Sequence, residues 1–203
     1  MFGGDPKARG DLSPGTLYAV AGADGRSIFY GQVCRDKTFG FFRVRHFQLS
    51  DTGGVITAPV MSRFGVGYPS VGATLRSGAW KKIGRAKLAD ELDCEGSYVQ
   101  WPVFTLDVQV WRGSDVIRTT RVEDPAIQHL EIIAAWDAVH HVPLRLLVDF
   151  APEQAATVSN AVWSVGGPVW RQRRVREEMA RRFPSGPHAL PEDWVPTTDK
   201  GTA

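Results

Sequence analysis

The sequence predicts an α+β protein, because strand patterns continue as far as residue 122 and the helix patterns come late. Residues 15–34 are predicted to form a β-hairpin, with arms Thr16–Ala21 and Ser27–Cys34 around the turn Gly22-Ala23-Asp24-Gly25. No strand–helix–strand repeat follows. We therefore expect a curved antiparallel sheet, open or partly closed into a barrel, with one packed helix and a helical C-terminal extension.

The region after the hairpin continues the strand pattern. Phe39–Phe47 alternates in its second half and is predicted to pair antiparallel with the second arm of the hairpin. Residues 63–78 are rich in glycine and are predicted to form a loop with at most one short strand. Residues 103–122 are expected to form a second hairpin around the turn Arg112-Gly113-Ser114-Asp115. Within the first hairpin, Gly31 has no side chain to pack, which indicates a bulge or a close backbone approach.

Helix signals begin at Asp124-Pro125, an N-cap residue followed by proline, and helical spacing of apolar residues predicts a helix to about Asp137. The apolar run Val142–Phe150 is compatible with a strand or a helix. Residues 152–163 and 169–183 are predicted to be helical, and the chain from Pro184 is predicted to be loose. We predict a domain over residues 11–150 and a helical extension over residues 151–203.

Composition narrows the class of protein. With 43% hydrophobic residues among 203, the chain can build a substantial core, and its net charge of +2 indicates neither a nucleic acid nor an acidic partner. Cys34 and Cys94 are far apart in sequence, which favours two reduced thiols over a disulfide. The sequence has no signal-peptide pattern and no long apolar run, so we expect a cytoplasmic protein without a membrane span.

No motif for catalysis or cofactor binding is present. His129-Leu130-Glu131 has the H-x-E of zinc deaminases but no P-C-x-x-C downstream, and His140-His141 has no further ligand at metal-site spacing. Phosphate-binding and dinucleotide-binding loops are also missing from the sequence. We expect no enzyme, no catalytic residue, no metal and no cofactor, although a site dispersed along the chain would leave no such pattern.

A nucleic-acid-binding module is the alternative function. Lys37, Phe39, Gly40 and Phe41 partly match a motif with which RNA-recognition modules stack bases, and the helix predicted over residues 169–183 is rich in arginine. Thr38 replaces a glycine of the motif, Val44 replaces its terminal aromatic residue, and a hairpin rather than a helix precedes it. Core packing is thus favoured for the aromatic residues, a solvated face for the arginines, and nucleic acid is disfavoured as a partner.

Two features are candidates for binding a protein partner. Asp90, Glu91, Asp93 and Glu95 place four carboxylates in six residues, which would suit a basic partner or form a solvated turn. Trp80 is flanked by Gly78 and two lysines, and is either a core residue or an anchor at an interface.

Three motifs in this order resemble the immunity protein 26 family, which occurs beside bacterial polymorphic toxins. They are the strand, Asp-Gly turn and Tyr-Gly-x-Val strand of residues 15–33, the Trp-x-x-Ile-Gly element of residues 80–84, and Leu130-Glu131 followed by Trp136. The resemblance covers about residues 11–150 and implies a non-enzymatic inhibitor that binds a cognate protein toxin. The residues that match the family pattern, and to which it gives a structural role, are Tyr30, Gly31, Trp80, Ile83, Gly84, Glu131 and Trp136.

Overall fold

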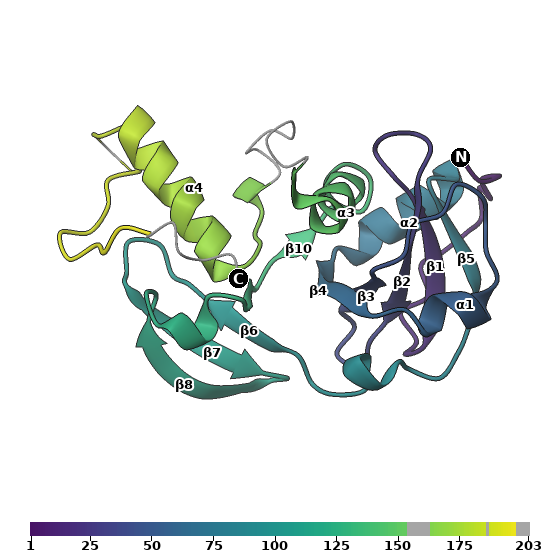
Figure 1. Cartoon of the computed structure of the whole chain (residues 1–203), viewed down its shortest axis with the longest axis horizontal. Helices are drawn as coiled ribbons and strands as arrows, with labels where there is room; N and C mark the ends of the chain where they lie inside the picture. The colour runs from purple at the N-terminus through teal and green to yellow at the C-terminus, as the bar shows by residue number, and fades with distance from the viewer. Residues whose placement is uncertain (154–162, 186, 198–203) are drawn as a thin grey trace. The chain divides into compact units, whose positions relative to one another are not determined.

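A computed structural model describes residues 1–153, 163–185 and 187–197 (Figure 1). The predicted α+β class is confirmed: the chain forms two mixed sheets, of six and four strands, together with helices. Two compact units are present, the first from Met1–Gly96 and the chain that begins at Ala135, the second from Ser97–Ala134 and the chain that begins at Trp163. This division differs from the boundary at residue 150 suggested by the sequence, because the strands after residue 96 pair among themselves instead of extending the first sheet.

The sheet of the first unit has the strand order β10-β4-β3-β2-β1-β5. Its neighbours are antiparallel except for β10 and β4, which are parallel. In the described chain the end strands β10 and β5 do not pair with each other, so the sheet is open and does not close into a barrel. The strands are β1 (Thr16–Ala21), β2 (Ile28–Val33), β3 (Phe39–Phe42), β4 (Val60–Val66), β5 (Trp80–Arg85) and β10 (Ala135–Trp136).

The first hairpin is confirmed as β1 and β2. Its turn includes Gly25 at φ 68°, a left-handed conformation that favours glycine. Gly31 lies between Tyr18 on β1 and Phe41 on β3. A Cβ atom on Gly31 would lie 2.8 Å from the ring of Phe41, so the expected close approach at this glycine is confirmed.

The helices of the first unit correct one prediction and decide an ambiguity. The loop predicted over residues 63–78 is wrong, because this stretch contains the end of β4 and the helix α2. Its proline and two of its glycines mark helix ends: Gly67 is the N-cap of α2, Pro69 lies in its first turn, and Gly78 ends it in a left-handed conformation at φ 77°. The apolar run Val142–Phe150, which was compatible with a strand or a helix, is helical. These elements are α1 (Thr52–Ile56), α2 (Tyr68–Ser77), the 3-10 turn η1 (Asp90–Leu92) and α3 (His141–Phe150).

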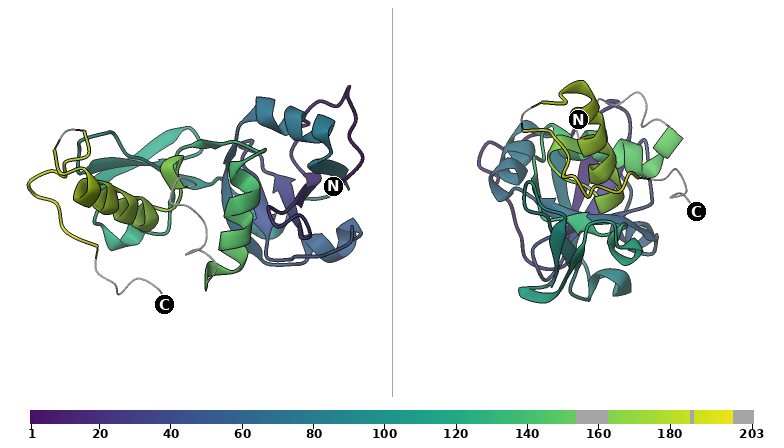
Figure 2. Two further views of the ribbon diagram at one scale, coloured as in Figure 1. Left: turned by 90° about the horizontal axis from the view of Figure 1, so that it is seen from above. Right: turned by 90° about the vertical axis from the view of Figure 1, so that its left-hand side faces the viewer.

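The second unit contains a sheet in the order β8-β7-β6-β9, with α4 running along it (Figures 1 and 2). The predicted second hairpin is confirmed, although its first strand begins at Asp107 and not at Val103. The predicted basic helix is also confirmed as α4. The elements are β6 (Ser97–Gln100), β7 (Asp107–Arg112), β8 (Asp115–Arg121), the 3-10 turn η2 (Pro125–Ile127), β9 (Glu131–Ile132) and α4 (Val169–Arg182).

The helix predicted from Asp124 to Asp137 is wrong. Asp124 does cap the backbone N–H of Ala126, but only the single turn η2 follows. The backbone then joins two strands, since Glu131 lies opposite Tyr98 on β6 and Ala135 lies opposite Gly65 on β4. Tertiary strand pairing thus overrides a local helix pattern.

The chain after Pro184 is not loose throughout. Trp194 stacks on Trp101, with ring centroids 5.9 Å apart and planes at 13°. The side-chain oxygen of Glu177 on α4 accepts hydrogen bonds from the Trp194 indole at 3.0 Å and the Thr197 backbone at 2.6 Å. This tail segment is therefore fastened to α4. The helix predicted over residues 152–163 falls largely outside the described residues.

Candidate protein-binding surface

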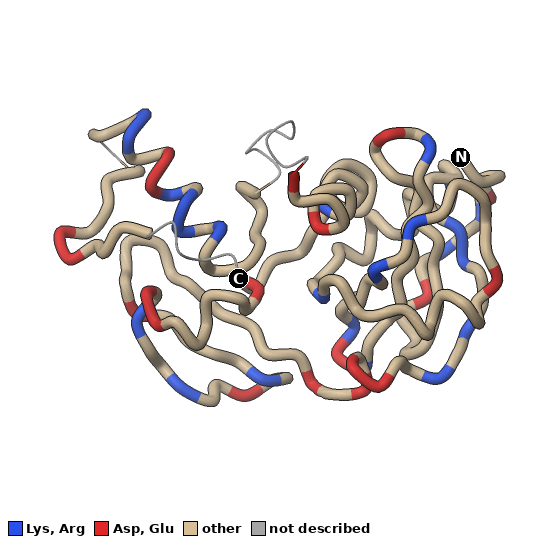
Figure 3. The backbone as a smooth tube through the Cα atoms, viewed as in Figure 1, with Lys and Arg blue, Asp and Glu red and all other residues tan. Residues whose placement is uncertain are grey.

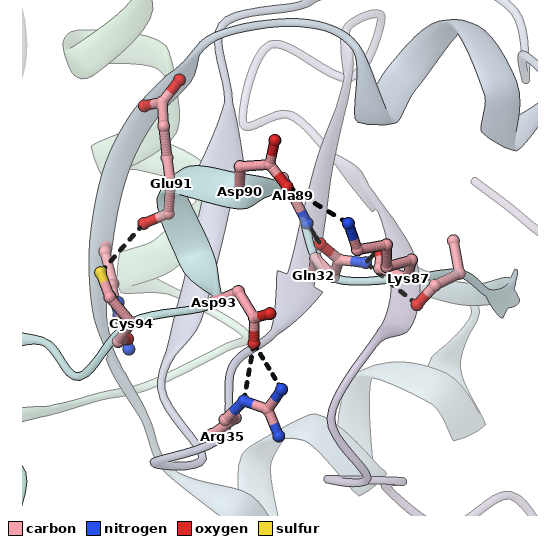
Figure 4. Close-up of polar contacts among 10 residues, drawn as sticks. Gln32, Arg35, Lys87, Ala89, Asp90, Glu91, Asp93 and Cys94 are labelled. Carbon is pink, nitrogen blue, oxygen red and sulfur yellow. Dashed lines mark hydrogen bonds and ion pairs between the residues drawn. The ribbon is translucent and has the colours of Figure 1, made fainter.

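The acidic segment, residues 90–95, follows β5 and is seated on the first sheet by a buried glutamine. Gln32, on β2, is fully buried. Its side-chain nitrogen donates to the carbonyl of Lys87 at 2.9 Å, and its side-chain oxygen accepts from the backbone N–H of Ala89 at 3.0 Å (Figure 4). Because both amide groups of a buried glutamine need partners, this pairing fixes the chain immediately before the acidic segment.

Leu92 holds the middle of the acidic segment against the sheet. Its side chain is buried in a cluster with Tyr30, Phe42 and other core residues. It lies directly over Gly40 on β3, where a Cβ atom would overlap its methyl groups. Leu92 therefore occupies space that only a glycine at position 40 leaves free.

Arg63 on β4 fixes the far end of the acidic segment. Its guanidinium donates to the carbonyl of Cys94 at 2.9 Å and to the carboxylate of Asp36 at 2.9 Å. Burial opposes ionisation of Asp36, but hydrogen bonds from Thr38 and the charge of Arg63 outweigh it, so the pKa of Asp36 is lowered. The buried glutamine, the buried leucine and this arginine together hold the segment at three points.

The four acidic residues of the segment are exposed; Figure 3 shows their backbone in red between β5 and β6, and Figure 4 shows the side chains of Asp90, Glu91 and Asp93. Asp93 accepts from Arg35 at 2.6 Å, and this hydrogen bond lowers the pKa of Asp93. Asp90 lies 3.4 Å from the ammonium of Lys87, with both side chains largely exposed. Among the described residues, Glu91 and Glu95 have no side-chain partner, and both are exposed. The segment thus presents unneutralised negative charge on a fixed backbone.

The two cysteines are free. Cys34 is buried, and burial raises the pKa of its thiol, which disfavours the reactive thiolate. Cys94 is exposed within the acidic segment.

Trp80, the other predicted binding residue, is in the core and only 1% exposed. Its ring packs against those of Tyr18 and Phe39, with centroids 5.8 and 5.7 Å away. The core interpretation of this tryptophan therefore holds, and the structure does not bring it to the surface beside the acidic segment.

The residues that match the family pattern fall on different elements. Tyr30 and Gly31 are on β2, and Ile83 and Gly84 are on β5. Glu131 belongs to β9 in the second unit, whereas Trp136 belongs to β10 in the first unit. The third motif is therefore not a helix.

The residues of the alternative nucleic-acid function are already engaged within the protein. Phe39, Phe41 and Phe42 are fully buried, so no base can stack on them in this conformation. On α4 the guanidinium of Arg176 lies 3.5 Å from the ring centroid of Trp101, and Arg171 lies over Trp163 and Trp170. Arg171 and Arg176 thus pack on aromatic rings, in cation–π geometry, whereas Arg181 and Arg182 at the end of α4 are exposed, as the sequence favoured.

The described residues contain neither a metal-binding cluster nor a membrane-spanning helix. No group of three or more His, Cys, Asp or Glu side chains in that part of the chain could hold a metal ion. No helix within it has the length and apolar character needed to cross a membrane.

Sequence reasoning found the acidic residues but missed those that position them. Gln32, Asp36 and Arg63 are 27 residues or more from their main partners in the chain, so no local pattern connects them. The one available signal was a glutamine within the otherwise apolar strand Ile28–Val33. No family model, curated protein or solved structure matches the chain.

Proposed function

We propose that this protein is a non-enzymatic immunity protein that binds a cognate bacterial toxin in the cytoplasm and neutralises it. The observation that supports this most directly is the acidic segment, where exposed carboxylates are displayed on a backbone held by Gln32, Leu92 and Arg63. A surface that is ordered before binding loses little conformational entropy when a partner docks. The order of the three sequence motifs is the second support.

The acidic segment suits a basic surface on the toxin. Glu91 and Glu95 have free carboxylates, and Asp90 is weakly compensated by Lys87 at 3.4 Å. Complementary charge accelerates association and fixes the orientation of two partners, and its contribution falls with ionic strength. Binding through this surface would inhibit the toxin by covering part of its surface, and it would need no catalytic reaction.

The test uses, as the toxin, the protein encoded by the gene next to the one for this protein, because immunity proteins of the family it resembles occur beside their toxins. Purified toxin and this protein should form a complex by calorimetry, and co-expression should protect cells. The double variant Glu91→Gln with Glu95→Gln should weaken binding about tenfold, mainly through slower association. The matched control, Glu192→Gln with Asp193→Asn, removes two exposed charges in the second unit and should bind normally. If the two proteins do not bind and co-expression does not protect the cells, the proposed function is wrong. Equal binding by both double variants would remove the acidic segment from it.

A further inference from the structure

The tail segment, residues 191–197, is joined to α4 by a weakly held connection (Figure 1). The described residues among 184–190 are exposed, except for the half-buried Leu190, and none of them makes a hydrogen bond. A ring contact between Phe183 and His188, with centroids 5.7 Å apart, joins this connection to the end of α4. Such an exposed segment opens at a low free-energy cost. The tail segment is therefore kept in place by its own contacts.

The polar contacts of the tail segment converge on one carboxylate of α4. A single side-chain oxygen of Glu177 accepts a hydrogen bond from the indole N–H of Trp194 at 3.0 Å. The same oxygen accepts from the backbone N–H of Thr197 at 2.6 Å and from its hydroxyl at 2.8 Å. Hydrogen bonds to an ionised acceptor are stronger than neutral ones. Glu177 thus favours a tryptophan followed, three residues later, by a residue with a hydroxyl group.

A buried arginine and a tryptophan complete the contact. Arg173 is only 6% exposed, and its guanidinium donates to the backbone carbonyl of Val195 at 2.6 Å. The ring of Trp101 stacks on that of Trp194, which removes apolar surface of both rings from water. We call Trp101, Arg173 and Glu177 the tail site. It combines an aromatic platform, a donor to a peptide carbonyl and a carboxylate acceptor, which are the parts of a site for an extended peptide.

None of these contacts requires the tail segment and the tail site to belong to the same chain. We propose that the tail site binds an extended segment with the pattern Trp-x-x-Thr, and that two copies of this chain exchange their tail segments to form a dimer. The tail segment of a second copy offers the same indole, carbonyl and hydroxyl groups to the same partners. Exchange of an identical element between two copies is a low-cost route to a dimer. The tail site lies within the second unit, so this inference is independent of the acidic segment and of the toxin.

The connection to α4 sets the concentration at which exchange becomes measurable. A tail segment on a short flexible connection docks on its own chain at an effective concentration on the order of 1 mM. The monomer therefore predominates in dilute solution, and the exchanged dimer is populated as the protein concentration approaches that value. Exchange is detected at lower concentration when docking on the same chain is prevented.

Two full-length variants, each with one half of the contact broken, test the exchange. Glu177→Lys keeps the tail segment but disables the tail site, whereas Trp194→Ala keeps the site but disables the segment. Each variant alone should be monomeric in sedimentation velocity. An equimolar mixture should form a 1:1 dimer, because the intact tail segment of the first variant docks on the free site of the second. As the matched control, the double variant Glu177→Lys with Trp194→Ala should not associate with Trp194→Ala.

A peptide of residues 191–197 with blocked ends measures the tail site directly. Calorimetry should show binding to the Trp194→Ala protein, and at least tenfold weaker binding to the natural protein, whose own tail segment competes. A peptide with alanine in place of Trp194 should not bind. Circular dichroism checks that each variant is folded. A mixture that stays monomeric, association of either variant alone, or a peptide that fails to bind Trp194→Ala would each overturn the proposal.

Discussion

The side-chain oxygen of Gln32 accepts a hydrogen bond from the backbone N–H of Ala89 at 3.0 Å. This contact connects a strand near the start of the chain to the loop that leads into the acidic segment. Because Gln32 is fully buried, water cannot replace either of its partners. The position of the exposed carboxylates therefore depends on a polar group inside the core.

Replacing Gln32 by leucine should lower the free energy of unfolding by about 1–3 kcal/mol, because the carbonyl of Lys87 and the N–H of Ala89 lose their buried partner. Urea denaturation measures the loss, and hydrogen exchange at the Ala89 amide reports it locally. Gln48→Leu, at an exposed position, is the control and should change stability by less than about 0.5 kcal/mol. Unchanged exchange at Ala89 would contradict this account of the anchor.

The sequence was most informative where structure is decided locally. The first hairpin follows from its glycine-containing turn and its β-branched and aromatic arms, and α4 follows from its helix-forming composition. The stretch from residue 63 was misjudged because Pro69 and Gly78 are loop residues by composition but, in this fold, the first-turn and capping residues of α2. Composition alone does not distinguish a helix bounded by such residues from a loop that contains them.

The failures at longer range have another cause. The pattern from Asp124 predicted a helix, but the pairing of Glu131 and Ala135 with distant strands decided the structure. In the candidate site the acidic residues were evident as a cluster, whereas their supports, Gln32 and Arg63, come from other strands of the sheet. Such partners become visible only after the strand order is known.

The ion pair between Asp11 and Lys82 should make the free energy of unfolding depend on pH in the acidic range. The hydrogen bond from Lys82 at 2.5 Å, together with those from Ser13, lowers the pKa of Asp11 well below its ordinary value of 3.8. A carboxyl with a lowered folded pKa stabilises the protein above its unfolded pKa, and this stabilisation is lost as pH falls toward the folded pKa. Asp11→Asn should therefore be less stable than the natural protein at neutral pH, and the difference should shrink below about pH 4.

The partner variant Lys82→Met provides the control for this prediction. Its stability difference from the natural protein should also shrink in acid, but less than that of Asp11→Asn, because Asp11 keeps its hydrogen bonds from Ser13. The double variant should lose less than the sum of the two single variants, because each single change already breaks the same pair. Denaturation at several pH values measures this. Full additivity of the two changes would show that the pair is not the origin of the effect.

Nucleic acid should not bind with appreciable affinity. The aromatic residues of β3 are buried, and Arg176 is desolvated over Trp101, which lowers its pKa to about 10. Electrophoretic shifts with single-stranded RNA and DNA at low and high salt should show no complex. A shift that weakens steeply with salt, and that disappears in Arg181→Gln with Arg182→Gln, would contradict this, because those two exposed arginines end α4.

The buried Arg145 should contribute strongly to the stability of the first unit. Only 1% exposed, its guanidinium lies 4.1 Å from the ring centroid of Phe64 and 4.5 Å from that of Trp136, and its Nε donates to Asp149 at 3.1 Å. Arg145→Met should cost about 3 kcal/mol in urea denaturation, because Asp149 loses this partner in a largely buried site. Arg43→Met, at an exposed position, is the control and should cost less than about 0.5 kcal/mol.

Removing the charge of Asp149, which is left unpaired in Arg145→Met, distinguishes the ion pair from ring packing as the source of this stability. Arg145→Met with Asp149→Leu should recover much of the loss, since a buried ion pair can often be replaced by apolar residues of similar size. Arg145→Lys keeps the charge but lacks the planar group that stacks on Phe64 and Trp136, so it should retain only part of the stability. If the double variant is as unstable as Arg145→Met alone, the contacts with the two rings, and not the pair with Asp149, account for the stability that Arg145 provides.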